Sequence, residues 1–374
     1  MKNRLFLVIT FIMMLIGWTG CDSTKTSDEL YSECSSGVVL VVNQYYHKIT
    51  LPTGKVWYFS DFDEDGDLED WTMDQEEILK NRKLITGTGF FISDKGVILT
   101  NNHVANPQIA VKDAKNSVRR VFSAMDEILK AAMQELSDQF DELEKSKSDC
   151  VQYNPYLEEY YVNEEKLNEI KTEQAQLKEQ YEELKQNKEQ LKTMDLSDLS
   201  VETICDLGIA YNDTYVTKVS DLVPCVVVKV SDKVNVDLAT LQLKNKQTPD
   251  NKYIFTVNET QEESFSDKVK NLFSDNDQQE LKTGQKLFMI GYNAGFTLSN
   301  TQQGIKAQIT NGTISQMPDE DKMMYTIPSL PGSSGSPVLN EYGQLVAVNF
   351  AGIRETQNFN YGIQLKRVQQ FLAQ

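Results

Sequence analysis

Three residues have the types and the settings that nucleophilic chemistry requires. His103 follows the apolar run VILTNN, Asp237 opens the apolar run VDLATLQL, and Ser334 lies in PGSSGSP. A serine hydroxyl becomes a good nucleophile when a histidine removes its proton, and a carboxylate must hold the other imidazole nitrogen. The chain has two histidines, and the other, His47, lies in the aromatic stretch QYYHKI and is given no role. We therefore predict His103 as the general base, Asp237 as its orienting group and Ser334 as the nucleophile.

The glycines beside the serine suggest how an oxyanion would be stabilised. They allow backbone N–H groups to point at one spot, and we expect the amides of Gly332 and Ser334 to form the oxyanion hole. A zinc site built from several histidines is excluded by the histidine count, and the five cysteines include no CxxC pair. We predict no cofactor.

The neighbourhoods of these residues resemble the trypsin-like serine peptidases of the bacterial HtrA and glutamyl-endopeptidase type. The similar stretches, which cover roughly a third of the chain, are TGTGFFISDKGVILTNNHV (86–104), VDLATLQL, TGQKLFMIGYN (283–293), ITNGTISQ (309–316), IPSLPGSSGSPVLNEYGQLVAVNFAGI (327–353) and NFNYGIQLKRVQQFL. The chain order His, Asp, Ser is also that of this class. The resemblance implies a mainly β fold, a double antiparallel β-barrel with the site between the barrels, and a serine endopeptidase that acts through an acyl-enzyme.

The sequence also departs from that family. Ser333 stands where digestive trypsins have Asp, so activation by burial of a newly cut N-terminus is not expected. Ser336 replaces the second glycine after the serine, and we expect no PDZ domain after the final helix. By spacing, the substrate pocket would be formed at its base by Pro328 and Ser329 and on one wall by Asn349, Phe350 and Ala351. No acidic residue occurs there, so we expect a small or apolar side chain at the cleavage site.

Two other stretches carry residues that could bind ligands or lipid. The acidic loop DFDEDGD resembles the start of an EF-hand, so Asp61, Asp63 and Asp65 could bind a structural calcium ion, although a solvated acidic turn is the simpler interpretation. Residues 1–20 have a basic start and a short apolar run, which is typical of an export signal. The following Cys21 resembles the lipidated cysteine of bacterial lipoproteins, and an ordinary cleaved signal is the alternative. We expect a protein of the bacterial cell envelope, lipid-anchored on a periplasmic or outer surface.

Four cysteines remain after Cys21. In an exported chain they could form two disulfides, and three connectivities are possible. Cys150 and Cys205 flank the second long helix, so their pairing is plausible and would leave Cys34 with Cys225. Four free thiols are the alternative.

Two long periodic segments interrupt the β-rich sequence. Helices are predicted from about Ser117 to Lys147 and from about Tyr156 to Lys192. Apolar residues recur at 3-4 spacing in both, which predicts an antiparallel coiled-coil hairpin about 45 Å long. The predicted seam residues are Phe122, Met125, Leu129, Ala132, Leu136, Gln139 and Leu143 in the first helix and Leu167, Ile170, Gln174, Leu177, Tyr181, Leu184, Lys188 and Leu191 in the second.

The remaining sequence reads as short strands separated by turns, which is typical of barrels. We expect strands at 37–44, 84–104, 222–243, 253–258, 286–291, 307–315, 323–327 and 345–350, a helix or loop at 259–279 and a final helix at 365–372. The domain prediction is a tether at 21–35, a first barrel at 36–245 that is interrupted by the helical hairpin at 115–200, and a second barrel at 246–374.

Composition limits the partners. The chain has 37 basic and 55 acidic residues and a formal net charge of −18, which argues against nucleic-acid binding. A polypeptide substrate is expected. The alternative is an envelope protein that binds a partner through the helical hairpin, with the barrels as a scaffold or as an enzyme that the partner activates. An esterase could use the same three residues, but the peptidase-like stretches argue against it.

Overall fold

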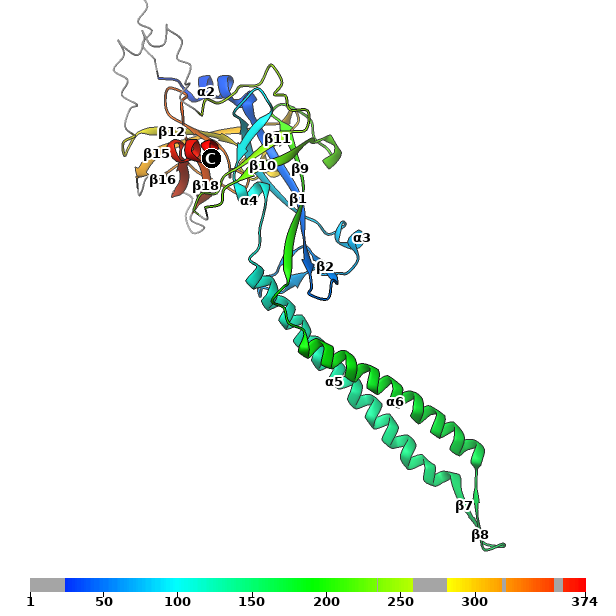
Figure 1. The fold of residues 1–374 in the computed structure, drawn as a ribbon. Coiled ribbons are helices and arrows are strands. Elements are labelled where there is room, and N and C mark those ends of the chain that lie inside the picture. Colours follow the sequence, from blue (N-terminus) through cyan, green and yellow to red (C-terminus); the bar gives the residue numbers. More distant parts are fainter. Residues whose placement is uncertain (1–23, 234, 258–280, 318–320, 353–358) are drawn as a thin grey trace, which may run out of the picture. The chain divides into compact units, whose positions relative to one another are not determined.

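The computed structural model describes residues 24–233, 235–257, 281–317, 321–352 and 359–374 (Figure 1). The chain divides into two compact units. One contains the residues up to Tyr45, Leu84–Gln108 and Cys205–Gln374, and the other contains Tyr46–Lys83 and Ile109–Ile204. Among the helices of the described ranges, none is long and apolar enough to cross a membrane.

The first unit contains two closed barrels. Six strands form the first ring, because β9 pairs back with β1: β1 (Val38–Thr50), β5 (Lys83–Phe91), β6 (Val97–Thr100), β11 (Ala239–Leu243), β10 (Val223–Val230) and β9 (Ser200–Tyr211). The second ring is β12 (Lys286–Gly291), β15 (Gln308–Gln316), β16 (Lys322–Tyr325), β19 (Asn360–Gln364), β18 (Leu345–Gly352) and β17 (Pro337–Leu339). The predicted mainly β fold, a double antiparallel barrel with an inserted helical hairpin, is confirmed.

The unbroken apolar run at the start of β1 follows from burial on both of its faces. Successive side chains of a strand point to opposite sides. Val38 and Leu40 therefore join a core shared with residues of the second barrel, whereas Val39 and Val41 pack inside the first. The final helix, α9 (Leu365–Ala373), contributes Val368 and Phe371 to this shared core.

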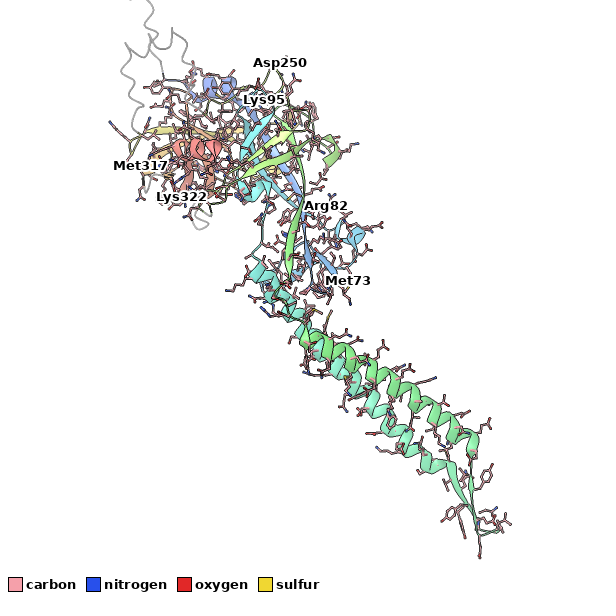
Figure 2. All side chains as sticks on the ribbon, viewed as in Figure 1. Met73, Arg82, Lys95, Asp250, Met317 and Lys322 are labelled. Atoms are coloured by element: carbon pink, nitrogen blue, oxygen red, sulfur yellow. The ribbon has the colours of Figure 1, made fainter. Side chains whose placement is uncertain are left out.

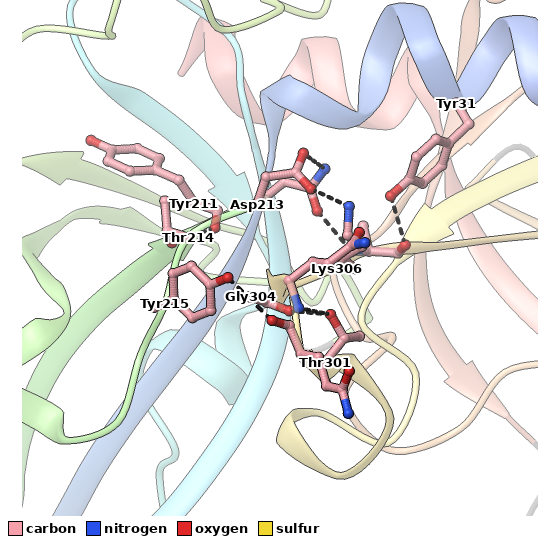
Figure 3. Close-up of polar contacts among 12 residues, drawn as sticks. Tyr31, Tyr211, Asp213, Thr214, Tyr215, Thr301, Gly304 and Lys306 are labelled. Carbon is pink, nitrogen blue, oxygen red and sulfur yellow. Dashed lines mark hydrogen bonds and ion pairs between the residues drawn. The ribbon is translucent and has the colours of Figure 1, made fainter.

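Polar contacts also connect the two barrels at the end of β9 (Figure 3). Asp213, which follows β9, forms an ion pair at 2.6 Å with Lys306, which precedes β15. The amide of Ala307 donates to Asn212 Oδ1 at 2.9 Å, and the Tyr31 hydroxyl donates to the Ala307 carbonyl at 3.1 Å. Short elements near this junction are η3 (Val219–Asp221), α8 (Phe296–Ser299), β13 (Asn300–Thr301) and β14 (Gly304–Ile305).

The N-terminal segment is part of the folded unit, so the tether predicted at 21–35 is wrong over most of its length. Residues 27–37 form helix α2 (Ser27–Cys34) and the turn η1 (Ser35–Gly37). Thr26 and Glu29 cap α2 reciprocally. Leu30 and Cys34 are fully buried. The apolar positions were too few for the sequence to reveal this helix.

The second unit contains the predicted helical hairpin, formed by α5 (Val111–Ser146) and α6 (Glu164–Thr193). Both helices lie side by side in Figure 1. Every predicted seam position of α6 is buried or half-buried. In α5 the prediction fails at Gln139, which is exposed, and Phe140 takes its place beside Gln174. Helix α5 begins at Val111, four residues before the predicted start of the inserted hairpin at 115.

The segment that joins these helices contradicts the second helix prediction. Between the turn η2 (Lys147–Cys150) and α6 the chain forms a two-stranded ribbon of β7 (Val151–Asn154) and β8 (Glu159–Val162). The predicted helix start at Tyr156 is therefore eight residues early. Pro155 opposes helix continuation, and the β-branched and aromatic residues on either side favour strands.

The base of the second unit packs around aromatic side chains. Its elements are β2 (Val56–Phe59), which pairs with β1, β3 (Asp61–Phe62), β4 (Leu68–Glu69) and α3 (Gln75–Ile78). Trp57 and Phe59 pack with Ala114 and Val118 of α5. His47 is 1% exposed, and its ring lies 5.0 Å from that of Phe59. His47 therefore occupies a packing position in this base.

One strand prediction needs correction, and one prediction falls on residues that the structure does not describe. Residues 253–257 form no strand, although Phe255 donates one backbone bond to Phe91. The segment predicted at 259–279 lies outside the described residues.

The predicted disulfides are not formed, because the four described cysteines are free thiols. Cys34 is in the core shared by the barrels and Cys225 inside the first barrel. Cys150 lies at the closed end of the helical hairpin, and all of α6 separates it along the chain from Cys205. Burial raises the pKa of Cys34 to about 11 and that of Cys225 to about 12, so both remain protonated.

Candidate active site

His103 is presented by a short helix at the end of a barrel strand. Strand β6 ends at Thr100, Asn101 precedes the helix, and α4 (Asn102–Ala105) carries His103 in its first turn. Asn43 of β1 donates to the carbonyls of Val104 and Ala105 at 3.0 and 3.2 Å. These bonds hold the end of α4 on the first barrel, while the His103 side chain remains 42% exposed.

Asp237 binds His103 through both of its carboxylate oxygens. Oδ2 forms a hydrogen bond with the imidazole Nδ1, and Oδ1 accepts the backbone amide of His103 at 2.9 Å. Asn101 adds a bond from its side-chain amide to the Asp237 carbonyl at 2.7 Å. A carboxylate accepts only, so Nδ1 carries a proton and Nε2 of a neutral ring is left with its lone pair. The structure thus brings the predicted base and its predicted orienting group together.

Ser334 lies in a tight loop that only glycines on both sides permit. Gly332 and Gly335 have φ angles of +101° and +87°. A Cβ at Gly332 would lie 2.4 Å from the Tyr292 carbonyl oxygen, and one at Gly335 would lie 2.1 Å from that of Thr88. The same hypothetical atom on Gly335 would be 3.2 Å from the Asn101 amide, so the serine loop lies directly against the segment that carries His103.

Thr88 of β5 connects the serine loop to the first barrel. Its amide donates to the Ser334 carbonyl at 2.7 Å, and its hydroxyl donates to the Gly332 carbonyl at 2.8 Å. The hydroxyl also accepts the Tyr292 amide at 3.0 Å, and the Thr88 carbonyl accepts the Thr100 hydroxyl at 2.7 Å. Thr88 is fully buried. It therefore fixes the carbonyls on both sides of Ser333, which sets the orientation of the intervening amides.

The backbone amides of the serine loop and the contact between Ser334 and His103 complete the description of the site. Among the residues that the structure describes, the amides of Gly332 and Ser334 donate to no protein acceptor. These are the two amides that the sequence predicts for an oxyanion hole. The side chains of Ser334 and His103, both within the described part of the chain, form no hydrogen bond with each other. Such bonds are often long without substrate and tighten in its complex.

A buried polar network supports the loop from below. Tyr325 donates its hydroxyl to Asn349 Oδ1 at 2.7 Å, and Asn349 Nδ2 donates to the Ser333 carbonyl at 3.0 Å. Burial holds the pKa of Tyr325 well above its usual range, so this donor keeps its proton. Ser333 donates its own hydroxyl to the Leu330 carbonyl at 2.7 Å. Ser333, where digestive trypsins have Asp, is therefore already bonded within its own loop.

The residues predicted for the substrate pocket have separate environments. Asn349 is 1% exposed and Ser329 lies 2.6 Å from the Ser333 hydroxyl, so both belong to the network beneath the loop rather than to an open wall. Pro328 is exposed. Phe350 is half-buried, and its ring lies 6.4 Å from that of Tyr361. The Ala351 backbone belongs to β18.

The acidic loop forms a hairpin, which fits the simpler of the two interpretations, an acidic turn, rather than the possible calcium site. The amides of Asp65 and Asp67 both donate to Asp63 Oδ1, at 3.0 and 2.8 Å, so this oxygen is bonded within the loop. Arg120 of α5 forms an ion pair with Asp67. Within the described residues, no group of three or more acidic, histidine or cysteine side chains could hold a metal ion. Asp61, Asp63 and Asp65 do not converge.

Sequence reasoning missed the residues that hold the site in place. Thr88, Asn101 and Tyr325 are polar groups within or beside apolar strands, and nothing in their spacing shows what they contact. The one available signal was their position, since Thr88 and Asn101 lie inside the stretch that contains His103.

Comparison with known proteins agrees with the fold. Residues 206–348 match the family model of the trypsin-like peptidase domain. That range includes Asp237 and Ser334 and runs from the first barrel into the second. No curated protein matches the chain.

One similar solved structure is the crystal structure of the serine endoprotease from Yersinia pestis, at 12% sequence identity and a TM-score of 0.41. The alignment covers 94% of this chain and 66% of that one, so the chain spans just under two thirds of that protein's length.

Proposed function

We propose that this chain is a serine endopeptidase in which His103 is the general base, Asp237 its orienting group and Ser334 the nucleophile. The observation that carries the proposal is the pair of hydrogen bonds between Asp237 and His103, one to the imidazole and one to the backbone amide. One carboxylate thus holds both the backbone and the ring of His103, as a general base requires. The matched peptidase-domain model and the free amides beside Ser334 support the same assignment.

The proposed reaction proceeds in two stages. His103 Nε2 accepts the proton of the Ser334 hydroxyl while Oγ attacks the carbonyl carbon of the scissile bond. The amides of Gly332 and Ser334 stabilise the oxyanion of the tetrahedral intermediate. The imidazolium, stabilised by Asp237, then gives its proton to the leaving amine, and the C–N bond breaks to leave an ester on Ser334. A water molecule, deprotonated by His103, hydrolyses that ester and returns Ser334 to its starting state.

The test is digestion of a peptide library by purified wild-type protein and by Ser334→Ala. We expect Ser334→Ala to lower kcat by at least about a thousandfold, because both stages pass through that oxygen. The matched control is Ser148→Ala, which removes an exposed serine of the second unit and should leave the rate unchanged. Equal cleavage by Ser334→Ala would refute the assignment, and rapid turnover of simple esters without any peptide cleavage would favour an esterase.

We propose a small or apolar side chain at the cleavage position. No acidic residue lies among Pro328, Ser329 and Phe350, so a basic substrate side chain would have no counter-charge there. The same library digest tests this: enrichment of lysine or arginine before the cleaved bond would contradict it.

We also propose that the protein is exported and anchored by lipid on Cys21. The support is the sequence pattern of residues 1–20. Because α2 begins at Ser27, only a few residues would separate the lipid from the folded unit. Metabolic labelling with a palmitate analogue should modify the wild type and not Cys21→Ser; labelling of both would contradict the proposal.

A further inference from the structure

The closed end of the helical hairpin exposes an unusual concentration of apolar surface. Tyr156 is 95% exposed and Tyr160 74% exposed, and the rest of the ribbon is similarly open. The large exposed side chains of this segment, here called the tip, are Val151, Tyr153, Tyr156, Leu157, Tyr160 and Tyr161. Side chains project outward from the end of the hairpin in Figure 2. Exposed apolar residues gathered in this way mark interaction sites.

The ribbon that presents this surface has its own defined order. Tyr153 pairs with Tyr160 across the strands, and their rings lie 5.1 Å apart. Val151 pairs with Val162 on the same face, so that face is entirely aliphatic and aromatic. A two-stranded ribbon buries almost nothing by itself. This apolar face is therefore not explained by the stability of the ribbon.

The charge around the tip is strongly one-sided. Residues 149–165 contain five carboxylates and no lysine or arginine: Asp149, Glu158, Glu159, Glu164 and Glu165. All five are exposed. A second copy of the tip would bring like charges together, and an anionic lipid surface would be repelled in the same way. Carboxylates beside tyrosine rings suit lysine and arginine, whose cations also stack on aromatic faces.

We propose that the tip is a docking surface for a protein partner that presents basic side chains among apolar ones. Tyrosine provides large contact area with few rotatable bonds, as it does in antibody combining sites. The carboxylates then select a basic partner and speed its association. The proposal rests on the second unit alone and does not depend on the peptidase assignment.

The test is binding of a fluorescent peptide that alternates arginine with leucine, with an aspartate–leucine peptide as the charge control. The full chain carries Ser334→Ala throughout, so that cleavage of the probe cannot imitate loss of binding. We expect saturable binding of the basic peptide at physiological salt. Tyr156→Ser combined with Leu157→Ser should weaken it about tenfold, since both residues lie in the turn outside the paired strands. A second variant, Glu158→Gln with Glu159→Gln, should weaken binding and reduce its dependence on salt.

Matched controls lie elsewhere on the same hairpin. Ile128→Ser removes an exposed apolar side chain of α5, and Glu179→Gln with Glu183→Gln removes two exposed carboxylates of α6. Neither should change the affinity. Equal binding by the tip variants and the controls would overturn the proposal. So would failure of the basic peptide to bind, tip-dependent binding to phosphatidylglycerol or phosphatidylcholine vesicles in its place, or self-association that the tip variants abolish.

Discussion

At the scale of single residues, the site depends on groups that never touch substrate. Thr88 holds the carbonyls of Gly332 and Ser334, while Asn101 and Asp237 hold the segment that carries His103. A nucleophile and a base on different barrels can meet only if both loops have fixed positions. The buried hydroxyl of Thr88 is the direct link between the serine loop and the first barrel.

Replacing Thr88 with valine should slow acylation of Ser334 about tenfold or more. The change removes the donor to the Gly332 carbonyl and the acceptor of the Tyr292 amide, and it should cost about 1–3 kcal/mol of stability as well. Thr88→Ser keeps the hydroxyl and should restore most of the acylation rate. The measurement is the labelling rate with a phosphonate, together with the free energy of unfolding. A valine variant that is less stable but labelled at the wild-type rate would show that Thr88 has a structural role only.

His47 should make the second unit sensitive to acid. Burial is the main cause that lowers its pKa to about 4, against 6.5 in the unfolded chain, and the charge of Asp61 opposes this shift in part. The folded form is therefore neutral between those values while the unfolded form is protonated. Stability is complete above pH 6.5 and decreases as the pH falls towards 4.

We expect His47→Gln to reduce that pH dependence. Between pH 7 and 5 the histidine should contribute a loss of about 2 kcal/mol in the free energy of unfolding, which the variant should lack. Urea titrations of both proteins at the two pH values measure the difference. The same loss in both proteins would mean that other groups cause it.

At the scale of elements, the helical hairpin combines an apolar seam with a few buried polar groups. Gln174 is 6% exposed and donates to Glu144 at 2.9 Å across the seam. The hydrogen bond from Lys147 is the main cause that lowers the pKa of Glu144, and the bond from Gln174 adds to it. Polar seam residues fix the register of two helices at some cost in stability.

Gln174→Leu should therefore stabilise the helical hairpin by about 1 kcal/mol, since leucine fills the seam and exposed Glu144 stays solvated. Gln174→Ala, which leaves a cavity, should destabilise it. Thermal unfolding followed by circular dichroism provides the comparison. If Gln174→Leu were less stable than Gln174→Ala, packing of leucine in the seam would not be the stabilising factor that we expect.

The elements also show what could and could not be predicted from the sequence. The seam of α6 follows from periodicity, because burial on one face repeats at a fixed spacing. Most barrel strands follow from short apolar or β-branched runs between turn residues. The ribbon at 151–162 and helix α2 were missed, since short elements contain too few residues to establish a period. The pairing of His103 with Asp237 was predicted from the resemblance and the chain order, whereas Thr88 and the Tyr325–Asn349 network depend on tertiary contacts that no local pattern encodes.

At the scale of the whole molecule, both barrels and all three proposed catalytic residues belong to one compact unit, and the helical hairpin belongs to the other. A hairpin shortened by joining Leu136 to Tyr181 keeps the α5 residues that pack at the base, Ala114 and Val118. We expect this variant to retain the peptidase activity of the wild type on short peptides and to lose binding of the basic probe. Loss of peptide cleavage in a folded variant would show that the second unit is needed for catalysis.

The most direct test of the central claim is covalent labelling by a fluorophosphonate, with the modified peptide identified by mass spectrometry. A serine activated by His103 and Asp237 attacks the phosphorus and displaces fluoride, while an ordinary serine does not react. We expect one adduct on Ser334, lost in Ser334→Ala and in His103→Ala and retained in Ser148→Ala. A folded wild-type protein that is not labelled, or that is labelled at another serine, would contradict it.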